Sequence, residues 1–159
     1  MYWRDKLNLT KLMAIVNIVI FFVVGSSVQA EDYSDSKITK VIMLGSGNPF
    51  PDPKRSGPSV AIVVNEVPYI FDSGAGVWQA TGAATPKYGG SIKALESNNI
   101  SKVFLTHLHS DHVVGLPSLI LLPWQFGREA PLEVYGPPGT EHMIKHLVEA
   151  FREDIGSRK

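Results

Sequence analysis

Residues 102–112 read KVFLTHLHSDH, and this stretch decides how the rest of the chain is interpreted. Residues 102–106 contain β-branched and aromatic side chains and no chain breaker, so they predict a buried strand that ends where the histidines begin. The next six residues contain three imidazoles and one carboxylate, which are all side chains that bind zinc-like metals. This density of ligands predicts a metal site.

The spacing inside this histidine cluster (residues 107–112) predicts two adjacent metal ions. His107 and His109 are two residues apart and share a side of an extended backbone, so both imidazoles can bind one ion. Asp111 and His112 lie beyond a turn and can hold a second ion. Two ions about 3.5 to 4 Å apart can share a water and lower its pKa towards about 7. The alternative, histidines packed beside a helix that Asp111 caps, explains a lone histidine better than three in six residues.

Around this cluster the chain resembles the metallo-β-lactamase superfamily, and most of all its ribonuclease Z and arylsulfatase-like branch. The resemblance covers about residues 38–155. It rests on THLHSDH at 106–112 with GLP at 115–117, LGSG at 44–47, FDSGAG at 71–76 and VYGPPGT at 134–140.

The resemblance implies an α/β fold, the αββα sandwich, with a binuclear zinc site whose bound hydroxide cleaves the substrate. By the same resemblance, His107 and His109 bind one zinc ion, and Asp111 and His112 bind the other. Asp111 is also implied as the proton acceptor. Asp72 is implied to orient the ligand loop, a role that metal-bound histidines commonly need.

Two classes of function compete for this sequence. The first is a metal-dependent hydrolase of a phosphodiester, a sulfate ester or a related small anionic ester, and the second is a non-catalytic or degenerate metal-binding protein. Narrower enzyme alternatives are a tRNA 3′-processing endoribonuclease and a β-lactamase, the latter disfavoured by the GPPG segment at 136–139. Proline and glycine make residues 45–58 a long loop, on which Arg55 is a candidate contact for an anionic substrate, although a solvated charge is the simpler interpretation.

Residues 1–30 have the pattern of a signal peptide. Basic residues precede a 13-residue apolar run at 12–24, and small residues at cleavage-type positions end the segment at Ala30. A membrane-spanning helix needs about 20 apolar residues, so a stable anchor is not expected. The product is expected to be periplasmic or secreted, and the absence of cysteine excludes disulfides and cysteine ligands.

The charge of the expected mature chain argues against a nucleic-acid partner. Removal of residues 1–30 leaves 12 basic and 14 acidic residues, a net charge of −2. Surfaces that bind phosphate backbones are usually strongly basic, and here the basic residues are scattered. A small anionic ester is therefore the expected partner, and the sequence leaves a homo-oligomer open.

The number of ligands suggests that residues 31–159 form the N-terminal part of a hydrolase domain. A catalytic zinc normally takes about three protein ligands, so two ions need roughly five or six, whereas the histidine cluster supplies four. By resemblance these residues match only the first half of the family's domain. We therefore expect an incomplete site and an apolar surface left uncovered.

Hydrophobic patterns predict the remaining elements. His142 and His146 have the i, i+4 spacing that can bind zinc, but they fall on the side of their helix opposite its apolar stripe and are expected to be solvated. Thr140 is expected to cap that helix. The expected strands are 40–44, 59–64, 67–71 and 132–135, with a turn at 65–66, and the expected helices are 89–98, 113–122 and 140–153.

Overall fold

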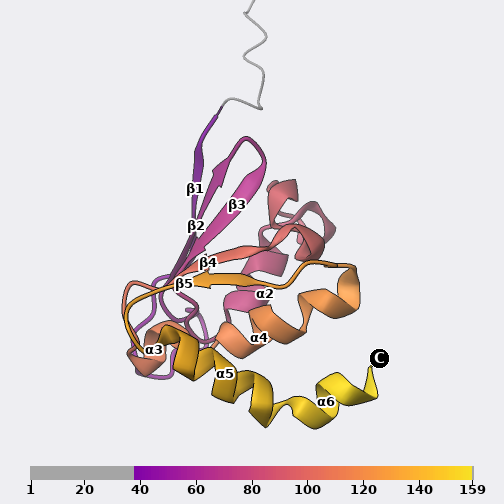
Figure 1. Cartoon of the computed structure of the whole chain (residues 1–159). Helices are drawn as coiled ribbons and strands as arrows, with labels where there is room; N and C mark the ends of the chain where they lie inside the picture. Colours follow the sequence, from indigo (N-terminus) through magenta and orange to yellow (C-terminus); the bar gives the residue numbers. More distant parts are fainter. Residues whose placement is uncertain (1–37, 159) are drawn as a thin grey trace, which may run out of the picture. The chain divides into compact units, whose positions relative to one another are not determined.

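The computed structural model describes residues 38–158, so the signal peptide expected at 1–30 lies outside the described residues. The described part is an α/β structure in which helices pack against one face of a single five-stranded sheet (Figure 1). Within these residues, no helix is long and apolar enough to cross a membrane.

The sheet combines an antiparallel half with a parallel half. Its strands lie in sequence order, with β1, β2 and β3 antiparallel and β3, β4 and β5 parallel. The expected turn is confirmed: Asn65 and Glu66 both have positive φ, 50° and 60°, as the tightest hairpin turns require. The strands are β1 (Lys40–Gly45), β2 (Ser59–Val64), β3 (Val67–Phe71), β4 (Lys102–Phe104) and β5 (Glu133–Tyr135).

The strand expected at 102–106 ends two residues early, for a reason that matters to the site. The Thr106 amide donates to the Asp72 carboxylate at 2.8 Å, so the backbone leaves the sheet at this point. The chain therefore turns towards the histidines under the control of a side chain from the end of β3.

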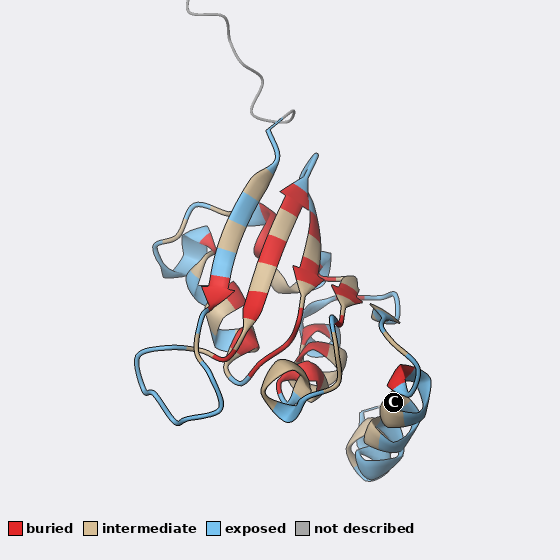
Figure 2. Ribbon diagram, turned by 90° about the vertical axis from the view of Figure 1, so that its left-hand side faces the viewer, coloured by how far each residue is buried: buried red, intermediate tan, exposed pale blue. Residues whose placement is uncertain are grey.

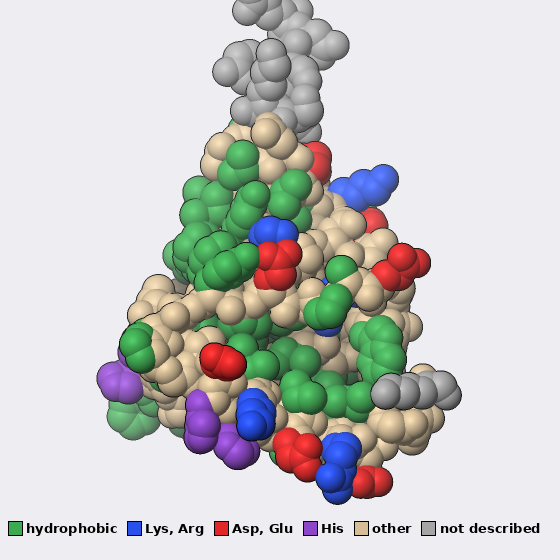
Figure 3. Space-filling view, in the orientation of Figure 1, with side chains coloured by type: hydrophobic (Ala, Val, Ile, Leu, Met, Phe, Trp, Pro, Cys, Tyr) green, Lys and Arg blue, Asp and Glu red, His purple; other side chains and the backbone are tan. Residues whose placement is uncertain are grey.

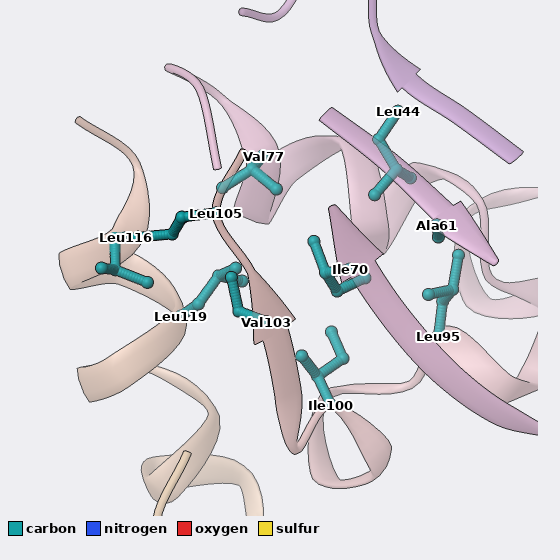
Figure 4. Close-up of a cluster of buried hydrophobic side chains, with 10 residues drawn as sticks. All are labelled: Leu44, Ala61, Ile70, Val77, Leu95, Ile100, Val103, Leu105, Leu116 and Leu119. Carbon is teal, nitrogen blue, oxygen red and sulfur yellow. The ribbon is translucent and has the colours of Figure 1, made fainter. Parts of the chain in front are cut away.

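The hydrophobic core lies between the sheet and the helices. Ala61, Ile70 and Val103 point to this side from three adjacent strands and are fully buried (Figure 4). Leu116 and Leu119 meet them from the helical layer. The longer elements of that layer are α2 (Val77–Ala83), α3 (Ser110–Val113), α4 (Leu116–Leu121), α5 (Thr140–Ala150) and α6 (Arg152–Ser157), and 3₁₀ turns cover Pro86–Tyr88, Lys93–Leu95, Ser97–Asn99 and Pro123–Phe126.

The opposite face of the sheet carries no helix among the described residues (Figure 2). It is nevertheless apolar: Val41 and Met43 are 69% and 64% exposed, and the Phe104 ring stacks between Phe71 and Tyr135. Hydrophobic side chains accordingly gather on the surface over β1 to β3 (Figure 3). An apolar sheet face of this kind normally packs against another layer.

Two expected helices are wrong in extent. Residues 89–98 form no α-helix, because Gly89 has a φ of +89° and only short 3₁₀ turns follow it. The helix expected at 113–122 is shorter than predicted: α3 already ends at Val113, and α4 covers only Leu116–Leu121, with Gly115 as its N-cap residue. A Cβ atom at Gly115 would lie 2.2 Å from the Gly74 carbonyl oxygen, so close packing of two backbones requires glycine there.

The last expected helix is divided. Helix α5 ends at Ala150, and Phe151 separates it from α6, which sequence analysis did not distinguish. The expected cap is wrong as well: the N-cap residue is Gly139, and the Thr140 hydroxyl donates to the Pro137 carbonyl instead. Helix α2 was not predicted, because its sequence, VWQATGA, is short and rich in small residues.

Candidate metal centre

The histidine cluster lies where the chain passes from the end of β4 into α3 (Figure 1). His107 and His109 precede α3 on extended backbone, with His109 as the N-cap residue at φ −64° and ψ 143°. Asp111 and His112 lie in the first turn of α3. Histidine side chains gather on the lower edge of the molecule over α3 and α5 (Figure 3).

The structure brings the imidazoles of the cluster together. The ring centroid of His107 lies 4.6 Å from that of His109 and 4.1 Å from that of His112. The nearest carboxylate oxygen of Asp111 lies 3.6 Å from His112 Nε2. The two predicted pairs of ligands, His107 with His109 and Asp111 with His112, are therefore neighbours. The His107 ring lies next to a ring of each pair.

Asp72 supports this arrangement from the end of β3. Its side chain is almost completely buried, and Oδ2 lies 2.8 Å from His112 Nδ1. The same carboxylate accepts hydrogen bonds from the Thr106 amide at 2.8 Å and from the Thr106 hydroxyl at 2.8 to 3.0 Å. Asp72 thus holds both ends of the loop that carries the histidines.

The sequence analysis did not identify Thr106 as a residue of the site. Its hydroxyl lies 2.9 Å from His107 Nδ1 as well as contacting Asp72. An ionised carboxylate only accepts hydrogen bonds, so the hydroxyl donates its proton to Asp72 and accepts from His107 Nδ1–H. Its position directly before the first histidine of the cluster was the available signal.

The supported rings leave the same nitrogen free. With Nδ1–H donating to Asp72 from His112 and to Thr106 from His107, Nε2 keeps its lone pair in the neutral form of each ring. A hydrogen bond to one ring nitrogen is the usual way in which a protein fixes the tautomer of a metal-binding histidine. The contacts of Asp72 have the form that its predicted orienting role requires.

The backbone of the turn at Asp72 lies very close to the backbone of the loop that carries the histidines. Asp72 has a φ of +58°, a conformation that aspartate tolerates better than most residues. Its amide donates to the Phe104 carbonyl at 2.8 Å, and the Ser73 amide donates to the His112 carbonyl at 2.7 Å. A Cβ atom at Gly74 would lie 2.7 Å from the Asp111 carbonyl oxygen, so the FDSGAG glycines let the turn contact the histidine loop.

The side chains of the cluster are of the types that bind zinc, because they are imidazoles and one carboxylate. The set is not complete by itself. Within residues 38–158, no three His, Cys, Asp or Glu side chains are placed so that they could hold one ion. As placed in the described residues, the cluster therefore offers no more than two such side chains to any one ion.

Arg55 lies apart from these contacts. Its Nε is 3.7 Å from an Asp52 carboxylate oxygen, and its side chain is 66% exposed on the loop after β1. Its expected contact with substrate stays a prediction. A hollow of about 670 Å³ lies elsewhere again, between α2 and the 3₁₀ turns, and none of the cluster residues lines it.

The family described as "Anti-Pycsar protein Apyc1" matches residues 39–153 of the chain. Curated relatives include Ribonuclease Z of Mycobacterium sp. (strain KMS), which is 36% identical over 121 residues, covering 75% of this chain and 39% of that protein. Ribonuclease Z of Mycobacterium marinum is 38% identical over 122 residues, with 75% and 40% covered. The chain thus spans about two fifths of the length of these relatives.

Solved structures show the same fold. Human tRNase Z, short form, superposes with a TM-score of 0.59 at 30% identity, over 70% of this chain and 39% of that one. The metallo-β-lactamase fold protein YhfI from Bacillus subtilis gives a TM-score of 0.55 at 20% identity, over 69% and 41%. The expected metallo-β-lactamase fold class is confirmed for the part of those structures that this chain covers.

Proposed function

We propose that this chain, which belongs to the Anti-Pycsar protein Apyc1 family and is a ribonuclease Z-like member of the metallo-β-lactamase superfamily, contributes the histidine cluster of a metal-dependent phosphodiester hydrolase. The observation that carries the proposal is the Asp72 network, which holds two imidazoles of the cluster with Nε2 free.

The proposal gives each residue a distinct task. His107 and His109 would hold one zinc ion, and Asp111 and His112 a second; bound zinc supplies a Lewis acid that lowers the pKa of a water and polarises the ester. Asp111 accepts a proton from the attacking water. Asp72 and Thr106 contact no substrate in this scheme and act by orienting the two rings.

A phosphodiester is the substrate class that fits best among the esters considered. The names Ribonuclease Z and tRNase Z associate those relatives with RNA, in which the cleaved bond is a phosphodiester. These names weaken the sequence-based expectation that nucleic acid is not a partner. A sulfate ester has no comparable support, and the choice between RNA and a small diester is left to experiment.

A non-catalytic metal-binding role is the second candidate. It is favoured by the number of potential ligands in the cluster, which is four, whereas two catalytic zinc ions need roughly five or six. Four ligands would suffice to bind metal without completing two catalytic centres. The two candidates differ in turnover and not in metal content.

Turnover by the full chain, loaded with zinc, tests the proposal directly. We expect hydrolysis of bis(p-nitrophenyl) phosphate and no hydrolysis of p-nitrophenyl sulfate, with a short single-stranded RNA as the second diester. Asp111→Asn should abolish the diester activity. Asp154→Asn is the matched control, because it makes the same change at an exposed carboxylate on α6.

The possible outcomes separate the candidates. Zinc binding without turnover of either diester would reject the hydrolase proposal for this chain and favour the non-catalytic role. Turnover that survives Asp111→Asn would show that the reaction occurs elsewhere. Cleavage of RNA alone would identify the nucleic acid as the substrate.

We also propose that the protein is exported and processed near Ala30. The support is the charge and hydropathy pattern of residues 1–30. Intact-mass analysis of the product from the periplasm or the medium should give a chain that begins at Glu31. Retention of residues 1–30 in the membrane fraction would reject export as a cleaved protein.

A further inference from the structure

Helix α5 carries two histidines that the histidine cluster does not use. His142 and His146 are both exposed and are separated by one helical turn. Their position away from the apolar stripe agrees with expectation, since Met143, Ile144 and Leu147 of the same helix pack against the core. What the sequence did not indicate is how the two rings are oriented.

The two rings lie within hydrogen-bond distance of each other. His142 Nε2 lies 3.1 Å from His146 Nε2, and the ring centroids are 4.4 Å apart. A metal–imidazole bond is about 2.0 to 2.1 Å long, so two nitrogens at this separation subtend an angle of about 100° at a shared ion. This angle is close to the 90° between neighbouring ligands in square-planar and octahedral complexes.

We propose that His142 and His146 form a second metal site, on the surface of α5, that takes a divalent ion with tetragonal or octahedral preference such as Cu²⁺ or Ni²⁺. Imidazole suits these ions, and for a given set of ligands Cu²⁺ binds most tightly in the first-row series. The exposed position leaves the remaining coordination sites to water. The inference is independent of the hydrolase proposal.

The charged neighbours on α5 do not dominate this site. Glu149 lies one turn beyond His146 on the same side of the helix, and helical side chains lean towards the N-terminus. Its carboxylate is already paired with Arg152 at 3.0 Å. Lys145 adds a positive charge beside the pair. Glu141, next to His142, adds a negative charge that offsets Lys145, so the opposite charges balance and binding is expected to depend on the two imidazoles.

A titration of the ¹⁵N-labelled full chain with Cu²⁺ tests the site without an activity assay. The chain is first loaded with zinc, and Cu²⁺ is then added below one equivalent. We expect paramagnetic broadening of amide signals around residues 142–146 of α5. Isothermal titration with Ni²⁺ gives the affinity for the same chain.

His142→Asn and His146→Asn should each remove the broadening on α5 and weaken Ni²⁺ binding there by about tenfold or more, because each leaves a single imidazole. Lys145→Asn is the matched control, since it makes an equally exposed change on the same helix without removing an imidazole, and should retain both signals. Circular dichroism checks that α5 is intact in every variant. Persistence of the α5 signal in either histidine variant, or its absence from the unmodified chain, would overturn the proposal.

Discussion

The histidine cluster at 107–112 and the histidine pair on α5 place imidazoles of one chain in two very different settings. In the cluster, a buried carboxylate and a hydroxyl determine which nitrogen of His107 and His112 is free. On α5, the two exposed rings contact each other through their Nε2 atoms, and no buried carboxylate supports them among the hydrogen bonds of the described residues. The comparison teaches that the side chains hydrogen-bonded to an imidazole, and not only the imidazole itself, determine how it can bind a metal.

The largest expected effect follows from removing the support of the cluster. Asp72→Ala leaves the Thr106 amide and His112 Nδ1 without their partner and places alanine at a φ of +58°. We expect a loss of about 3 kcal/mol in the free energy of unfolding, measured with denaturant, together with loss of bound zinc.

Asp72→Asn separates the two effects, because asparagine tolerates positive φ and its amide oxygen can still accept from Thr106. It should therefore be more stable than Asp72→Ala and still bind zinc poorly, because the charged acceptor of His112 is gone. Unchanged zinc binding in a folded Asp72→Ala variant would show that the hydrogen bonds of Asp72 do not distinguish the cluster from the histidine pair on α5.

The next effect concerns the ligands themselves. His107→Ala and His109→Ala should mainly empty one metal position, and Asp111→Ala and His112→Ala mainly the other. Metal content per chain after dialysis measures this. If the folded variants keep full metal content, the cluster is not the zinc site.

A smaller effect is expected from Thr106, which touches the ligand His107 but is not itself a ligand. Thr106→Val removes the hydroxyl that joins Asp72 to His107 and should weaken zinc binding by about 10- to 100-fold. Thr106→Ser keeps a hydroxyl and should bind zinc nearly as well as the unmodified chain. Equal zinc affinities for the valine and serine variants would show that this hydroxyl does not orient the ring.

The smallest effect is expected on α5. With zinc supplied at no more than the amount that the cluster holds, His142→Asn and His146→Asn should leave zinc content and the unfolding temperature unchanged, because both side chains are exposed. Competition between zinc and a metallochromic indicator provides the measurement. A fall in tightly bound zinc would mean that the two groups of histidines share a function.

Several features could be predicted from sequence because they depend on local patterns. Alternating and β-branched residues defined β2 and β3 at their observed bounds, and the turn between them followed from two residues, Asn65 and Glu66. The histidine cluster was recognisable because its potential ligands are consecutive. Such features need no knowledge of distant parts of the chain.

Only the tertiary structure decided the rest, because the deciding contacts join residues far apart in sequence. Asp72 meets His112 across 40 residues, and α4 begins only after Gly115, whose backbone packs against the backbone at Gly74. The exposed orientation of His142 and His146 follows from helical periodicity, whereas the 3.1 Å approach of their nitrogens depends on side-chain rotamers. Sequence patterns identify which groups are present, and packing sets the direction in which each one points.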